Sequence, residues 1–84
     1  MPDENMGPGL HIFVNRRKFE EGDGVKRSMT GAEIAALVNV PAENAVVRWD
    51  GGPQKGDEIP INQHVDIKNG DHFIVTRRVV EGGA

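Results

Sequence analysis

Residues 30–41 read Thr-Gly-Ala-Glu-Ile-Ala-Ala-Leu-Val-Asn-Val-Pro, and they carry the clearest helix signal in this chain of 84 residues. Thr30 and Glu33 have the spacing of a capping box, in which a hydroxyl accepts from a first-turn amide and a carboxylate reaches back. Apolar residues follow at the spacing of one helix side: Ile34, Leu37 and Val38. Pro41 blocks continuation of the helix. We therefore expect a helix over residues 31–39 with one buried face.

The segment before this helix predicts two strands. In residues 10–15, Leu10, Ile12 and Val14 alternate with the other three residues, so that the first set is expected to face the core. After a turn over residues 15–18, a second strand is expected over residues 18–27. Residues 22–24 read Gly-Asp-Gly and are expected to interrupt it with a bulge or a wide loop.

The segment after the helix predicts three more strands. Residues 45–50 alternate, with Val47 and Trp49 on one face. Residues 59–61 read Ile-Pro-Ile and can form only a short edge strand, because proline cannot donate to a central ladder. A turn over residues 69–71 precedes the last strand, in which the alternating core residues are Phe73 and Val75.

A single helix of about three turns cannot form its own core, so it must cover one face of a mixed sheet. The predicted fold is therefore an α+β roll. A ferredoxin-like alternative would need a second helix, and no second capped stretch with a 3.6-residue period is present in the sequence.

Composition narrows the function classes. The formal charge of −3 and the scattered basic residues argue against a nucleic-acid partner. The absence of cysteine excludes disulfides and zinc-thiolate sites and fits a cytoplasmic protein. No stretch approaches the ~20 apolar residues of a membrane span, so no membrane association is expected. Residues 1–9, rich in glycine and proline, are expected to be a flexible leader.

Side chains that could carry chemistry show no catalytic or metal-binding pattern. Three histidines lack carboxylate or cysteine neighbours at metal-ligand spacing: His11, His64 and His72. Three hydroxyl residues have no evident base partner in the sequence: Ser28, Thr30 and Thr76. We therefore expect no metal, no cofactor and no enzymatic activity.

The order of these elements, together with the Val40-Pro41 pair and the Gly82-Gly83 pair, resembles ubiquitin. Residues 30–34 and the segment Val65-Asp66-Ile67 leading to His72-Phe73 are more similar to bacterial multi-ubiquitin-domain proteins from ubiquitination-like operons. This resemblance implies a β-grasp domain, the ubiquitin-like roll, over residues 10–79. It also implies a flexible C-terminal tail over residues 80–84.

The resemblance further implies a protein modifier that is a substrate of other enzymes. A maturation and deconjugating peptidase would cleave after Gly83 and release Ala84. An ATP-dependent activating enzyme and a conjugating enzyme would then adenylate the Gly83 carboxylate, carry it as a thioester and join it to amines of target proteins. Two successive glycines suit this chemistry, because a backbone without Cβ can approach catalytic groups closely. Further residues are implied in recognition of the tail: Arg77, Arg78, Glu81 and Gly82.

This chain departs from the ubiquitin pattern at the surface. The positions that correspond to the centre of ubiquitin's apolar patch are Arg48, Ile74 and Thr76, so that the patch is largely polar here. Phe13 alternates away from the core set and is a candidate aromatic contact. A partner surface is therefore expected around Arg48, Ile74 and Phe13.

Two other functions share parts of this pattern. A β-grasp sulfur carrier would bear a thiocarboxylate on the same terminal glycine. A non-covalent ubiquitin-like adaptor would keep its tail intact and would be indifferent to loss of the tail.

Overall fold

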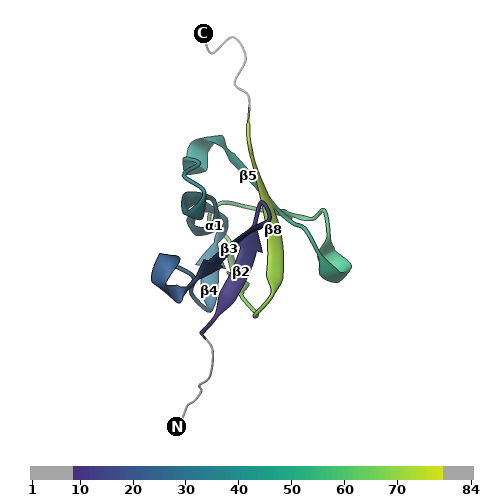
Figure 1. Ribbon diagram of the computed structural model, residues 1–84. Coiled ribbons are helices and arrows are strands. Elements are labelled where there is room, and N and C mark those ends of the chain that lie inside the picture. The colour runs from purple at the N-terminus through teal and green to yellow at the C-terminus, as the bar shows by residue number, and fades with distance from the viewer. Residues whose placement is uncertain (1–8, 79–84) are drawn as a thin grey trace, which may run out of the picture.

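The predicted helix forms and covers one face of a mixed sheet, so the protein has an α+β fold (Figure 1). The computed structural model describes residues 9–78. In that range the larger sheet has the order β3-β2-β8-β5-β6. Its strands are β2 (His11–Val14), β3 (Arg17–Glu20), β5 (Ala45–Trp49), β6 (Glu58–Ile59) and β8 (Asp71–Arg77).

A second sheet of two strands lies beside the first. It pairs β4 (Ser28–Thr30) with β7 (His64–Asp66) in antiparallel register. The helix α1 (Gly31–Leu37) follows β4 directly. Three short 3₁₀ helices occupy connections: η1 (Glu21–Asp23), η2 (Ala42–Asn44) and η3 (Gly52–Gln54).

Both ends of α1 are closed by the chain itself. The Glu33 amide donates to the Thr30 hydroxyl at 3.1 Å, and the Thr30 amide donates to the Glu33 carboxylate at 2.9 Å, which is the predicted capping box. At the other end Asn39 has a φ of 62°, and the Asn39 and Val40 amides donate to Ala36 and Ala35. This pattern is a Schellman motif, and it ends the helix two residues earlier than expected.

The larger sheet is mixed, because it contains both parallel and antiparallel strand pairs. β2 and β8 run parallel at its centre, with Phe13 opposite His72, whereas the remaining pairs are antiparallel. The hairpin between β2 and β3 turns at two residues with positive φ, Asn15 and Arg16. Such a primed turn matches the twist of the strands, so the loop is tighter than the expected turn over residues 15–18.

The prediction of one interrupted strand over residues 18–27 is wrong. β3 ends at Glu20, η1 follows, and the next strand, β4, belongs to the other sheet. The glycine-rich stretch therefore separates two sheets and does not form a bulge within one. Gly24 allows this change of direction with a φ of 116°.

Thirteen buried apolar residues form the core between α1 and the larger sheet. The alternating residues expected to face inward do so, and Ile12, Val14, Val47, Phe73 and Val75 are at most 5% exposed. On the helix, Ile34 and Ala35 are fully buried, whereas Leu37 and Val38 only flank the core. The predicted buried face is therefore confirmed at Ile34 and only in part at Leu37 and Val38, while Ala35 takes the second fully buried position on the helix.

Two further details differ from the sequence-based expectation. The edge strand β6 is Glu58–Ile59, so Pro60 and Ile61 lie beyond it. β7 was not predicted as a strand. Gly31 sits so close to the backbone after β6 that a Cβ there would lie 2.7 Å from the Pro60 carbonyl oxygen. This contact explains why glycine opens the helix.

Candidate functional site

β8 is the element that leads towards the predicted reactive tail, and it is held to the sheet along its whole length. Arg77 pairs with Ala45 of β5, and the Arg78 amide donates to the Asn44 carbonyl oxygen. The chain is therefore anchored up to Arg78, at the end of the sheet opposite the start of β2 (Figure 1). Gly82, Gly83, Glu81 and Ala84 lie outside the described residues, as do residues 1–8 of the expected leader.

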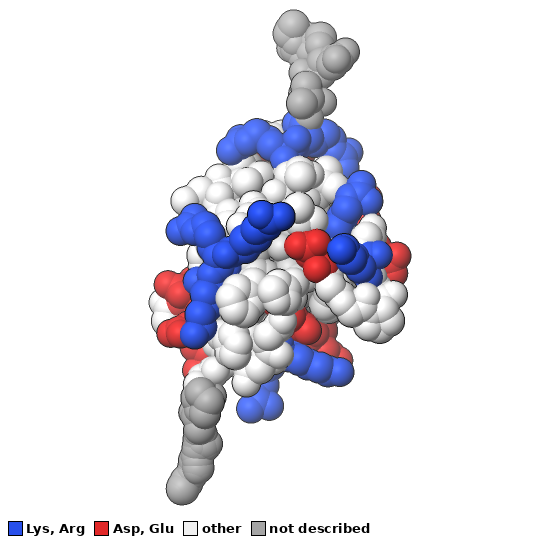
Figure 2. Space-filling view, turned by 45° about the vertical axis from the view of Figure 1, so that its right-hand side comes forward, with Lys and Arg blue, Asp and Glu red and all other residues white. Residues whose placement is uncertain are grey.

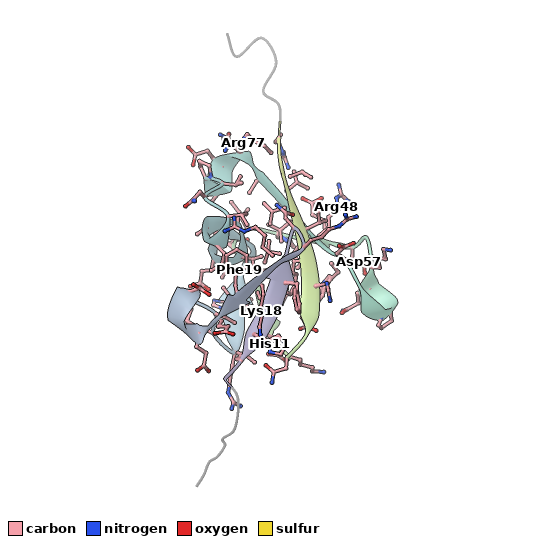
Figure 3. All side chains as sticks on the ribbon, viewed as in Figure 1. His11, Lys18, Phe19, Arg48, Asp57 and Arg77 are labelled. Carbon is pink, nitrogen blue, oxygen red and sulfur yellow. The ribbon has the colours of Figure 1, made fainter. Side chains whose placement is uncertain are left out.

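The two arginines of the predicted recognition segment are both exposed. An Arg78 guanidinium nitrogen lies 4.0 Å from a Glu58 carboxylate oxygen, with both side chains about half exposed. An ion pair in this setting contributes only ~0 to 1 kcal/mol, so a partner can displace it at little cost. Figure 3 shows Arg77 at the end of β8. Both arginine side chains are thus exposed at the C-terminal end of β8.

The outer face of the larger sheet, on the side away from α1, carries the predicted partner surface. Arg48 and Ile74 stand directly opposite each other on β5 and β8, and Ile74 is 38% exposed. Val46 and Thr76 form the next pair on the same face. The structure therefore brings Arg48 and Ile74 together, with an apolar contact area of only a few side chains.

Phe13 lies on this face but is less exposed than a free aromatic contact would be. Its ring stacks on His72 with centroids 4.7 Å apart and an interplanar angle of 10°. His11 meets the Phe13 ring edge-on at 5.8 Å. The alternation in each strand places these residues outward, but only the parallel register of β2 and β8 brings Phe13 beside His72.

Charged groups surround this outer face. Lys18 lies opposite Phe13 on β3, and Arg48 lies on β5, so that the two cations flank β2 and β8 from opposite sides (Figure 3). Lys18 also lies 3.3 Å from the Glu20 carboxylate. Figure 2 shows Lys and Arg atoms bordering an uncharged strip, with Asp and Glu atoms between them. The surface is thus mixed in charge around a small apolar centre.

Asn15 has a role that sequence inspection missed. Its side-chain amide nitrogen donates to the Val75 carbonyl oxygen at 3.1 Å, and its amide oxygen accepts from the Val75 N–H at 2.8 Å. Its backbone N–H donates to the Phe73 carbonyl oxygen at 3.0 Å. The side chain thus continues the parallel ladder beyond the end of β2 and fastens the middle of β8.

Ser28 has a base partner that the sequence did not reveal. Its hydroxyl lies 3.1 Å from the Nδ1 atom of His64, across the small sheet. Both residues are exposed, and water competes for such a bond. We interpret it as a link between β4 and β7. Within residues 9–78, no group of three or more His, Cys, Asp or Glu side chains is arranged to hold a metal ion.

The described lysines are all on the surface: Lys18, Lys26, Lys55 and Lys68. Lys26 forms an ion pair with Glu33, with 2.6 Å between its Nζ atom and a carboxylate oxygen. That hydrogen bond, followed by the one from Thr30, lowers the pKa of Glu33 below its ordinary value.

Among residues 9–78, no helix is long and apolar enough to cross a membrane. No protein-family model, no curated protein and no solved structure matches the chain.

Proposed function

We propose that this chain is a ubiquitin-like protein modifier with a β-grasp fold. The observation that carries the proposal is the course of β8. This central strand is anchored up to Arg78, and the sequence places Gly82-Gly83 only a few residues later. A modifier of this kind must be a stably folded domain whose terminal carboxylate can enter the active sites of other enzymes.

The β-grasp assignment draws on the order of elements around that strand. A hairpin, a helix and a return to the sheet follow one another, and the last long strand inserts beside the first in parallel register. The helix covers one face, and we assign the opposite face, which carries Arg48, Ile74 and Phe13, to partners. This arrangement accords with the resemblance to ubiquitin in residues 10–79.

The proposed chemistry takes place at Gly83. A peptidase hydrolyses the bond after Gly83 and frees its carboxylate. That carboxylate attacks the α-phosphate of ATP in an activating enzyme and releases pyrophosphate. An enzyme thiolate then displaces AMP to form a thioester, and a target amine finally displaces the thiol. The chain supplies the carboxylate and acts as substrate, with no catalytic residue of its own.

Reach sets the geometry of this transfer. The five residues from Val79 to Gly83 span at most about 17 Å when fully extended. An enzyme active site must therefore lie within that distance of Arg78. In this proposal the enzyme binds Arg77 and Arg78 at the C-terminal end of β8. Arg48, Ile74 and Phe13 provide a second contact on the outer face of the larger sheet.

Conjugation leaves a diagnostic remnant, which supplies the test. The tagged chain is expressed in its host, purified under denaturing conditions and digested with trypsin, which cleaves after Arg78. Target lysines should then carry the branch Val-Val-Glu-Gly-Gly. Gly83→Val should leave target lysines without a branch of any kind, including the Val-Val-Glu-Gly-Val that conjugates of this variant would give, because the β-branched side chain blocks close approach at the reacting carbonyl.

Gly22→Val is the matched control, because among residues 9–78 no atom beyond its two neighbours in the chain lies within 4 Å of the position its Cβ would take. It should conjugate like the natural chain. A Gly83 thiocarboxylate without branched peptides would identify a sulfur carrier instead. Partner binding that survives removal of residues 79–84, again without branches, would identify a non-covalent adaptor.

A further inference from the structure

A cavity of about 460 Å³ lies at the end of β8 opposite Arg77 and Arg78. Its walls come from the η3 loop, from β7 and from the turn before β8, and in Figure 1 the η3 loop projects from the side of the sheet. The side chains that matter for its chemistry are Trp49, Gln54, Gln63, Asp66, Lys68 and Asp71. The volume lies in the range of small-ligand sites, ~300 to 1,000 Å³.

Trp49 forms the aromatic wall of this cavity and is held firmly. It is the last residue of β5 and stands opposite Phe73, with ring centroids 4.7 Å apart at a tilt of 38°. Its backbone N–H donates to the Asp57 carbonyl oxygen, and its own carbonyl oxygen accepts from Gly56. The indole is half-buried, so it packs on the core and also lines the cavity.

The loop around η3 contributes two glycines to the lining of the cavity, so part of this lining is backbone. Gly51 and Gly52 border the cavity, and Gly52 has a φ of 75°, which favours glycine. The loop is closed by hydrogen bonds from Lys55 to Gly52 and from Asp57 to Gln54. These bonds close the loop on itself, and those from Gly56 and to Asp57 tie it to the Trp49 backbone, so the loop that lines the cavity is ordered by the protein's own contacts.

The polar groups that line the cavity favour a cation. Two carboxylates, Asp66 and Asp71, oppose one ammonium group, Lys68. One oxygen of Asp71 accepts from the Lys68 backbone N–H at 2.9 Å, and an ionised carboxylate has the capacity to accept further hydrogen bonds from a ligand. Gln54 and Gln63 add amide oxygens. Carboxylates repel phosphate, so this donor set disfavours an anionic ligand.

We propose that this cavity binds the guanidinium group of an arginine side chain from a partner protein. A planar guanidinium can stack on the indole of Trp49 and at the same time donate to carboxylate and amide oxygens. Arginine meets both requirements better than lysine, because its donors lie in one plane with the cation. The site needs no contribution from the C-terminal tail.

The position of the cavity gives the interaction a distinct use. Asp71 and Arg77 mark the two ends of β8, about 20 Å apart at the rise of a strand. A partner that inserts arginine beside Trp49 would therefore leave the C-terminal end of β8 accessible to the enzymes of conjugation. The inference goes beyond the proposed function, and the two can fail separately.

Trp49 provides a direct assay, because it is the only tryptophan and the chain has no tyrosine. The probe is the peptide acetyl-Gly-Arg-Gly-amide, and the control peptide carries citrulline, which has nearly the same shape without the charge. The arginine peptide should change Trp49 fluorescence saturably, with a dissociation constant on the order of 1 mM. Backbone NMR shifts should map to residues 49–54 and 63–71. Binding of citrulline should be at least about tenfold weaker.

Two variants of opposite charge sharpen the test. Asp66→Asn should weaken binding about tenfold, whereas Lys68→Gln should strengthen it, because it removes the competing cation. Glu43→Gln makes the same charge change as Asp66→Asn on an exposed residue outside the cavity, and it should leave binding unchanged. Equal binding of citrulline, equal effects of Asp66→Asn and Glu43→Gln, or no saturable binding would each overturn the proposal.

Discussion

At the scale of single residues, Asn15 shows how one side chain extends a strand ladder. Its amide both donates to and accepts from Val75, and its positive φ suits asparagine better than most residues. Asn15→Ala should lower the free energy of unfolding by about 2 kcal/mol, because two partly buried groups of Val75 lose their partner. Chemical denaturation followed by Trp49 fluorescence measures this loss.

Two further variants show whether the Asn15 hydrogen bonds are the cause. Asn15→Asp keeps an acceptor for the Val75 N–H but loses the donor to the Val75 carbonyl oxygen, so its loss should be smaller than that of Asn15→Ala. Asn62→Ala removes an exposed asparagine amide and should cost less than about 0.5 kcal/mol. Equal losses for Asn15→Ala and Asn62→Ala would contradict the proposed role.

At the scale of the elements, α1 is bound to the sheet by an unequal set of contacts. Ile34 is fully buried, and Ile34→Ala should lower the free energy of unfolding by about 2 to 5 kcal/mol. Leu37 is half-buried and packs beside Gly24, so Leu37→Ala should cost clearly less, about 1 kcal/mol. Thermal or chemical denaturation ranks the two. The reverse order would mean that the helix is rotated relative to the structure.

The N-terminus of α1 also makes stability depend on pH. The hydrogen bond from Lys26 and then that from Thr30 lower the pKa of Glu33 from 4.5. The stabilisation is therefore present above about pH 4.5 and is lost as the pH falls through the lower folded-state pKa. Glu33→Gln keeps an acceptor for Thr30 but cannot ionise. Its stability deficit should shrink from pH 7 to pH 3, and a deficit that stays constant would count against this assignment.

At the scale of the whole molecule, folding and the proposed conjugation depend on different parts of the chain. Within residues 9–78, the thirteen core residues lie between Ile12 and Val75 and form one cluster. Removal of residues 79–84 should therefore leave the unfolding temperature within about 2 °C of the full chain and still abolish every branched peptide. Calorimetry and the tryptic assay measure the two effects on one sample. A large drop in unfolding temperature would show that the tail stabilises the fold.

Local pattern was sufficient where one segment of chain carries its own signal. The spacing of Thr30 and Glu33 predicted the capping box, and alternation predicted which side of β8 is buried. The same pattern placed the end of the helix two residues too late, because the Schellman motif that ends it depends on the conformation of Asn39. Alternation likewise placed Arg48 and Ile74 on the outer face. These features depend on side-chain periods of 2 residues in strands and 3.6 residues in helices, and such periods can be recognised within a short stretch of sequence.

The sequence by itself therefore determined the strand faces, the helix and the glycine pair, because each is written in neighbouring residues. Only the tertiary structure decided that β4 joins β7, that Asn15 reaches Val75 and that Phe13 stacks on His72. The cavity beside Trp49 also appears only there. The pairing of β4 with β7, the bond from Asn15 to Val75 and the stacking of Phe13 on His72 all join residues about 35 to 60 positions apart in the sequence. Strand register across such separations is set by packing of the whole core, and no local period encodes it.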